Sequence, residues 1–129
     1  MSDKPIGQKL SIKPSNKFLL VNPPAGYAAM LGELPAGVSL LDTASGAVEA
    51  IQVFVANRHE LEAQLLRLKQ LLSPKGMIWV TYHKGTSKVK TDINRDTIVA
   101  YARTLGLQGV AMISIDDDWA ALRLKLTGE

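Results

Sequence analysis

The residues with the clearest chemical potential lie in one polar tract, residues 83–95, with the sequence HKGTSKVKTDINR. This tract is longer than the roughly 2–6 residues usual between a strand and a helix. Ammonium groups, hydroxyls and backbone N–H groups before a helix bind phosphate and other anions. The tract therefore predicts an anion-binding loop for a nucleotide, a phosphate or a nucleic acid, with these candidate ligand-binding residues: Lys84, Thr86, Ser87, Lys88, Lys90 and Arg95.

A second set of polar residues follows the other predicted strands. In an open parallel sheet, ligands bind outside the carboxyl ends of the strands, so residues after different strands converge there. We therefore expect one cleft lined by Asn22, Tyr27, His83, Asp116, Asp117 and Asp118. Within it, His83 could act as acid or base because its ordinary pKa is about 6.5. Asn22 or Asp116 would then orient it.

Each of these side chains also has a structural interpretation. The three aspartates could form a turn that charge keeps in solvent, and the lysines could be a solvated loop face. Lysines of the tract could also fold back onto the aspartate turn, an exposed contact of about 0–1 kcal/mol. Adjacent carboxylates in one turn rarely converge on a cation, so no metal site is predicted.

Two amphipathic segments predict the helices that position these residues. In residues 58–72, four leucines recur at helical spacing, and Asn57 is a candidate N-cap with Glu60 three residues later. A second helix is expected over residues 95–105, capped by Asp92 or Asn94 and closed by Gly106. One or two helical turns are expected over residues 25–31.

Short apolar runs between the helices predict the strands, namely residues 18–21, 38–41, 50–55, 76–82, 110–115 and 119–126. The alternation of strands and helices favours a single three-layer α/β domain over residues 17–129. Its twisted sheet would hold about six strands, mostly parallel, with a C-terminal antiparallel hairpin strand. Residues 1–16 are expected to be a flexible basic leader.

Composition narrows the class of protein. Without cysteine the chain has no disulfide or zinc–thiolate site, which fits a cytoplasmic protein. No apolar run approaches the ~20 residues needed to span a bilayer, so no membrane association is predicted. The net charge of +3 is a mild basic bias that does not by itself indicate a nucleic-acid binder.

Three catalytic or cofactor motifs are incomplete. The Lys84-Gly-Thr-Ser run lacks the spaced glycines of a P-loop. Asn22-Pro-Pro is similar to the Asn-Pro-Pro-aromatic motif of amino-group methyltransferases, but Ala25 stands in place of the aromatic residue. No G-x-S-x-G nucleophile elbow exists, so no catalytic residue is assigned.

Several runs together resemble the short bacterial proteins grouped as domain-of-unknown-function family 3052, over about residues 14–126. They are Val21-Asn-Pro-Pro, Ile51-Gln-Val-Phe, Trp79-Val-Thr-Tyr, Lys84-Gly-Thr-Ser-Lys-Val-Lys and Asp116-Asp-Asp-Trp. The resemblance implies no activity, and His83 stands where the family leads us to expect proline. The order of elements is also similar to the second half of a class I methyltransferase. That likeness implies a shrunken methyltransferase-like (Rossmann-like) architecture without the methyl-donor glycine turn.

Together these observations predict a non-catalytic binding or regulatory module whose anion-binding loop lies at the carboxyl edge of the sheet. The cofactor is left open. The alternative is a small enzyme or a degenerate methyltransferase-like protein that uses the same edge. A possible homodimer through an exposed edge strand is a third, structural, hypothesis.

Overall fold

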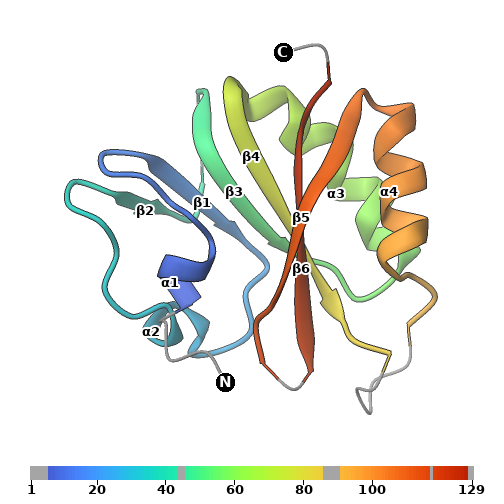
Figure 1. The fold of residues 1–129 in the computed structure, drawn as a ribbon, viewed down its shortest axis with the longest axis horizontal. Helices are drawn as coiled ribbons and strands as arrows, with labels where there is room; N and C mark the ends of the chain where they lie inside the picture. The colour runs from blue at the N-terminus through green and yellow to red at the C-terminus, as the bar shows by residue number, and fades with distance from the viewer. Residues whose placement is uncertain (1–5, 44–45, 86–90, 117, 128–129) are drawn as a thin grey trace.

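The apolar runs of the sequence assemble into one six-stranded sheet, in the order β2-β1-β3-β4-β6-β5 (Figure 1). The computed structural model describes residues 6–43, 46–85, 91–116 and 118–127. The strands are β1 (Lys17–Val21), β2 (Ser39–Leu41), β3 (Val48–Phe54), β4 (Leu72–His83), β5 (Leu107–Ser114) and β6 (Trp119–Leu126). Each helix joins two strands or precedes the first, as in α/β proteins.

The directions of the strands confirm the predicted mixed sheet. β2, β1, β3 and β4 are parallel neighbours, whereas β6 is antiparallel to both β4 and β5. The return strand does not extend the edge of the sheet, because β6 lies between β4 and β5. The last strand in the sequence, β6, is therefore an interior strand of the sheet.

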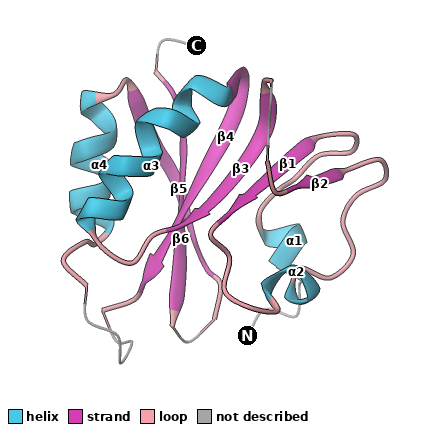
Figure 2. Ribbon diagram, turned by 180° about the vertical axis from the view of Figure 1, so that it is seen from behind, coloured by secondary structure: helices cyan, strands magenta, loops and turns pink. Residues whose placement is uncertain are grey.

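Two long helices cover one face of the sheet, α3 (Arg58–Leu71) and α4 (Arg95–Thr104), as Figure 2 shows. Their leucine and isoleucine stripes pack against alternate residues of the strands, as the sequence predicts. Asn57 caps α3 by accepting from the backbone N–H of Glu60, and Asn94 forms a capping box with Thr97. The Glu60 carboxylate accepts from the N–H of Ala56, one residue before the N-cap Asn57.

Two four-residue helices lie on the opposite face, α1 (Ile6–Lys9) and α2 (Tyr27–Met30). The expected leader differs from the structure here. Ile6, Leu10 and Ile12 are buried in the core of this face, and Trp79 Nε1 donates to the carbonyl of Leu10 at 2.9 Å. Residues 6–12 therefore belong to the packed structure, because their three large apolar side chains cover the sheet.

In the part of the chain that the structure describes, no helix has the length and apolar character needed to cross a bilayer.

Candidate functional site

The carboxyl ends of β1, β3, β4 and β5 lie at one edge of the sheet, the lower edge in Figure 1. Asn22 follows β1, Val55 follows β3, Lys84 follows β4 and Ile115 follows β5. The hairpin between β5 and β6 turns at the same edge. This is the edge where the sequence places the candidate residues.

A first hollow, which we call the switch-point hollow, opens between the ends of β1 and β3 and has a volume of about 380 Å³. At this point the connections diverge, because β1 has β2 on one side and β3 on the other. Such a switch point is where open α/β sheets bind ligands. The hollow is lined by Asn22, Pro24, Phe54, Val55, Ala56, Glu60 and Trp119.

The turn after β1 is built differently from a glycine-rich cofactor turn. Asn22 adopts the left-handed region at φ 56°, and Gly26 does so at φ 80° just before α2. Between them, Pro23 and Pro24 supply no backbone N–H. The turn therefore offers few donors to an anionic ligand group.

Tyr27 is a core residue, which corrects its expected place in the cleft. Its side chain is 2% exposed, and its hydroxyl donates to Gln52 Oε1 at 3.0 Å. Gln52 Nε2 in turn donates to Thr81 Oγ1 at 3.0 Å, so both buried polar side chains of β3 and β4 are satisfied. Burial raises the pKa of Tyr27 to about 12. The sequence could not reveal this because Tyr27 directly follows an exposed turn.

An aromatic row runs beside the switch-point hollow on the α1 and α2 face. The rings of Tyr27 and Phe54 meet edge to face at 4.6 Å, and Phe54 and Trp119 do so at 5.0 Å. Trp119 then stacks on His83 at 3.9 Å. These contacts hold Trp119 as a rigid wall of the hollow.

His83 is placed for packing rather than for the expected acid–base arrangement. Its Nδ1 is buried and has no hydrogen-bond partner among the described residues. Asp116 Oδ1 accepts from the N–H groups of Asp118 and Trp119, so its carboxylate holds the hairpin turn. Asn22 lines the switch-point hollow, which His83 does not line. The structure therefore brings these residues to one edge without linking them. Asp117 lies outside the described residues.

A second hollow, the β4–α4 hollow, has a volume of about 530 Å³ and lies between the ends of β4 and β5 and the start of α4. Its floor is mainly apolar and its rim carries Lys84 and Arg95. The lining residues are Tyr82, Lys84, Gly85, Asn94, Arg95, Asp96, Met112, Ile113, Ser114 and Ala120. Burial raises the pKa of Tyr82, whose hydroxyl contacts Met112 Sδ at 3.3 Å.

Lys84 is held at the rim by two hydrogen bonds. Its ammonium donates to Ser114 Oγ at 2.6 Å and its backbone N–H donates to the Asp118 carbonyl at 2.8 Å. No carboxylate among the described residues forms an ion pair with Lys84. The Lys84 side chain therefore contacts Ser114 of β5 in place of the expected aspartate carboxylates, and only the Lys84 backbone contacts the aspartate turn. Arg95 lies 3.7 Å from Asp96, measured from Nε to Oδ1.

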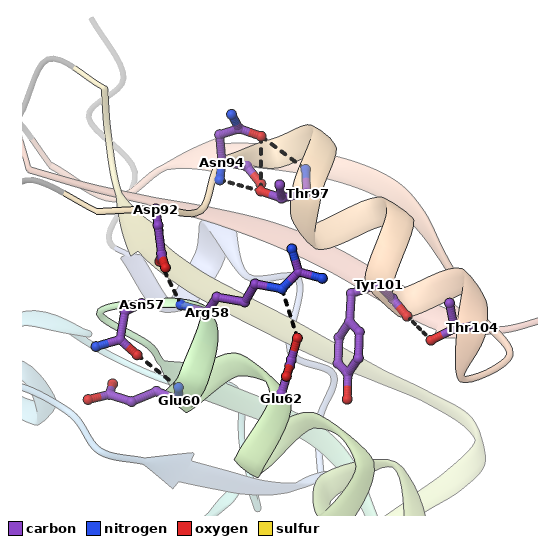
Figure 3. Close-up of polar contacts among 9 residues, drawn as sticks. All are labelled: Asn57, Arg58, Glu60, Glu62, Asp92, Asn94, Thr97, Tyr101 and Thr104. Atoms are coloured by element: carbon purple, nitrogen blue, oxygen red, sulfur yellow. Dashed lines mark hydrogen bonds and ion pairs between the residues drawn. The ribbon is translucent and has the colours of Figure 1, made fainter.

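The far end of the polar tract is anchored to the start of α3 (Figure 3). Asp92 Oδ1 accepts from the backbone N–H of Arg58 at 2.7 Å, and the Thr91 hydroxyl donates to the Ala56 carbonyl at 2.7 Å. The first bond satisfies a free backbone N–H at the start of α3. Both bonds hold the tract next to the start of α3, just before the tract reaches the capped start of α4. Four of the predicted ligand-binding residues lie outside the described residues, namely Thr86, Ser87, Lys88 and Lys90.

Asp42 is a candidate functional residue that was not among the site residues predicted from the sequence. It is exposed and directly follows β2, whose Leu41 pairs with Leu19 of β1. A carboxylate at the end of the strand next to the first one can bind the hydroxyls of a ribose. The signal was available in principle, since Asp42 lies about 20 residues after the β1 turn, the spacing of that motif.

Comparison with known proteins identifies the fold. No protein-family model and no curated protein sequence matches the chain, so the resemblance to family 3052 stays a prediction. A ribosomal protein L11 methylase from Lactobacillus delbrueckii subsp. bulgaricus matches with a TM-score of 0.63 and 13% identity, over 92% of this chain and 73% of that one. A TehB-like SAM-dependent methyltransferase from Corynebacterium glutamicum matches with a TM-score of 0.59 and 12% identity, over 93% and 85%. A SAM-dependent methyltransferase from Aquifex aeolicus gives 0.59 and 13%, over 91% and 85%.

The chain therefore has the predicted methyltransferase-like α/β fold, and the main functional prediction is wrong. A non-catalytic binding module does not fit neighbours that are repeatedly SAM-dependent methyltransferases, some of them solved with S-adenosylhomocysteine. The alternative of a methyltransferase-like protein fits them better. At this level of identity a shared fold does not transfer the reaction, so the activity must be argued from the site.

Proposed function

We propose that this chain is a methyltransferase-like enzyme that binds an S-adenosyl nucleoside in the switch-point hollow. The proposal depends chiefly on the position of this hollow at the divergence of β1 and β3, in a fold shared with SAM-dependent methyltransferases. Asp42 supports it from the end of the neighbouring strand.

The residues present fit the nucleoside half of such a cofactor. Trp119, which is partly exposed and packs against the buried ring of Phe54, gives the hollow aromatic surface on which a purine can pack. The Asp42 carboxylate is exposed and can accept hydrogen bonds from ribose hydroxyls. Asn22 adds an amide that both donates and accepts. When bound, the cofactor would supply the methyl group for transfer.

The amino-acid half of the cofactor finds fewer partners. Pro23 and Pro24 remove two donors from the turn that faces the hollow. We therefore expect the nucleoside contacts to supply most of the affinity, so that adenosine binds nearly as well as the intact cofactor.

The β4–α4 hollow is the proposed site of the methyl acceptor. Its apolar floor suits a flat or aliphatic body, and Lys84 and Arg95 at the rim suit an anionic group. In a thermal-shift screen of small aromatic carboxylates and phosphates with S-adenosylhomocysteine present, Lys84→Gln should lose the hits that the unmodified protein gives. Hits that survive this substitution would move the acceptor elsewhere.

Calorimetric titration of S-adenosylmethionine, S-adenosylhomocysteine and adenosine tests cofactor binding directly. All three should bind, and Asp42→Asn should weaken each by about tenfold or more. This loss corresponds to the roughly 1.5–3 kcal/mol typical of a hydrogen bond to a charged group. Glu33→Gln is the matched control, because Glu33 is an exposed carboxylate without a recorded contact among the described residues.

Failure of all three compounds to bind at millimolar concentration would overturn the proposal. Equal losses in Asp42→Asn and Glu33→Gln would instead remove Asp42 from the site. Binding of the two S-adenosyl compounds without adenosine would contradict the division of affinity between the two halves.

A further inference from the structure

A third hollow lies at the opposite, amino edge of the sheet, where β4 begins and β6 ends, toward the upper side of Figure 1. We call it the amino-edge hollow, and its volume is about 310 Å³. Both hollows described above lie at the carboxyl edge, so this one is separated from them by the length of the strands. Its lining residues are Ser11, Lys13, Asn16, Glu49, Ser73, Lys75, Gly76, Met77, Arg123 and Lys125.

Positive charge dominates the lining of the amino-edge hollow. Four cationic side chains compare with one carboxylate, that of Glu49. Glu49 Oε1 already accepts from the backbone N–H of Lys17 at 2.6 Å. The ion pairs recorded among the described residues involve only the starts of α3 and α4. The four cations of the lining therefore form no ion pair among the described residues, and positive charge exceeds the single negative charge of Glu49.

Arg123 is the least satisfied of these cations. Its Nε is buried and has no hydrogen-bond partner among the described residues. A guanidinium cannot lose its proton, and a buried donor to which nothing is bonded costs free energy. β6 pairing sets Arg123 opposite Trp79 of β4, so its backbone position is fixed by the sheet. An oxyanion in the hollow would satisfy this donor.

A bulge in β4 brings Lys75 to the same hollow. Val48 pairs with Leu72, but Ala50 pairs with Met77, so four residues of β4 lie between partners only two apart in β3. The bulge is closely packed, since a Cβ on Gly76 would lie 2.6 Å from Leu72 Cδ1 and 2.9 Å from the Glu49 carbonyl oxygen. Lys75 is therefore carried by backbone that has little room to move.

We propose that the amino-edge hollow is a binding site for a small phosphate-bearing anion, with Arg123 and Lys75 as its main contacts. Phosphate groups match this lining because they carry several acceptor oxygens and more than one charge, and guanidinium binds them with two parallel hydrogen bonds. The volume of about 310 Å³ suits a free mono- or diphosphate group better than an extended strand of nucleic acid. This site is independent of the proposed cofactor site.

Calorimetric titration with inorganic pyrophosphate, with ionic strength held constant by KCl, tests this site. The unmodified protein should bind pyrophosphate, and both Arg123→Gln and Lys75→Gln should weaken binding about tenfold or more. Arg103→Gln is the matched control, because Arg103 is an exposed arginine of α4, which covers the other face of the sheet, and does not line this hollow, and it should stay within about twofold. Lys75→Gln keeps the test decisive if Arg123→Gln does not fold.

Absence of pyrophosphate binding, or equal losses in Arg103→Gln and Lys75→Gln, would overturn the site. A short single-stranded RNA serves as the second arm. RNA binding that pyrophosphate displaces supports the site, whereas RNA binding that pyrophosphate leaves unchanged assigns the surface to nucleic acid and overturns the small-ligand proposal. Binding of S-adenosylhomocysteine to Lys75→Gln should be unchanged, which separates this result from the proposed function.

Discussion

The two faces of the sheet are packed by different means. On the face of α3 and α4, helices of 14 and 10 residues bury regular aliphatic stripes, for example Leu61, Leu65 and Leu68. On the face of α1 and α2, each helix has four residues and cannot present a stripe. Large rings and buried hydrogen bonds take over there, as Phe18, Tyr27 and Trp79 show.

This difference shows on which face the fold tolerates shortened helices. A long helix covers a sheet through many similar contacts, whereas a short helix depends on a few specific ones. The reduced face is also the face of the β1 turn, where a nucleoside cofactor would need its closest protein contacts. The consequence is that single substitutions should have distinct signatures on the two faces.

The largest effect is expected from the aliphatic face. Leu68→Ala should lower the free energy of unfolding by about 2–5 kcal/mol, because Leu68 is fully buried and truncation leaves a cavity. Leu40→Ala on β2 is the matched control, since Leu40 is 42% exposed, and it should change stability by about 0.5 kcal/mol or less. Urea unfolding measures both. Equal losses would mean that the β2 edge is packed as tightly as the α3 stripe.

An intermediate effect is expected from the polar chain under α2. Tyr27→Phe leaves the Gln52 acceptor without its donor and should cost about 1–3 kcal/mol. Tyr101→Phe, at a half-buried tyrosine whose hydroxyl has no recorded partner among the described residues, is the control and should cost about 0.5 kcal/mol or less. A negligible loss in Tyr27→Phe would show that apolar contacts alone hold the short helices.

The same tyrosine predicts a pH dependence. Burial raises its pKa to about 12 in the folded protein, above the ordinary value of 10.0. Its contribution is therefore complete below pH 10 and is lost as pH rises toward 12, because the unfolded chain loses that proton first. Stability measured across this window should fall less steeply in Tyr27→Phe than in the unmodified protein. Identical slopes would contradict a buried, hydrogen-bonded hydroxyl.

The smallest effect is expected at a helix end. Asn94→Ala removes the side-chain acceptor of the α4 capping box and should cost about 1 kcal/mol. Asn94→Asp keeps an acceptor at the N-terminus and should retain most of the stability. The one-turn helix α2 has no side-chain cap to lose. Thermal unfolding distinguishes the variants, and equal losses in both would assign the effect to something other than capping.

The sequence predicts the aliphatic face well because its signals are local. The leucine spacing and Asn57 define α3, and Asn94 and Gly106 define the limits of α4. The other face depends on contacts between distant segments. Nothing in the spacing of Ile6, Leu10 and Ile12 shows that they cover the sheet.

The sequence predicts at which edge of the sheet the candidate site lies, but not all of the residues that line it. Topology alone brings Asn22, Lys84 and Arg95 to the carboxyl edge. It does not reveal that Tyr27 turns inward, because that depends on how residues 22–38 between β1 and β2 fold. The alternation of apolar and polar residues over residues 119–126 predicts a strand but does not show which strands it pairs with. The interior position of β6 could therefore not be inferred from the sequence.

That interior position has a consequence for how the chain acquires its structure during synthesis. β5 has β6 as its only neighbour in the described sheet, and β4 holds β6 on its other side. Until residues 119–126 have left the ribosome, β5 has no strand to join and one side of β4 stays unpaired. The first four strands can assemble while translation continues, but the final third of the sheet must close in one late step that depends on contacts far apart in the chain.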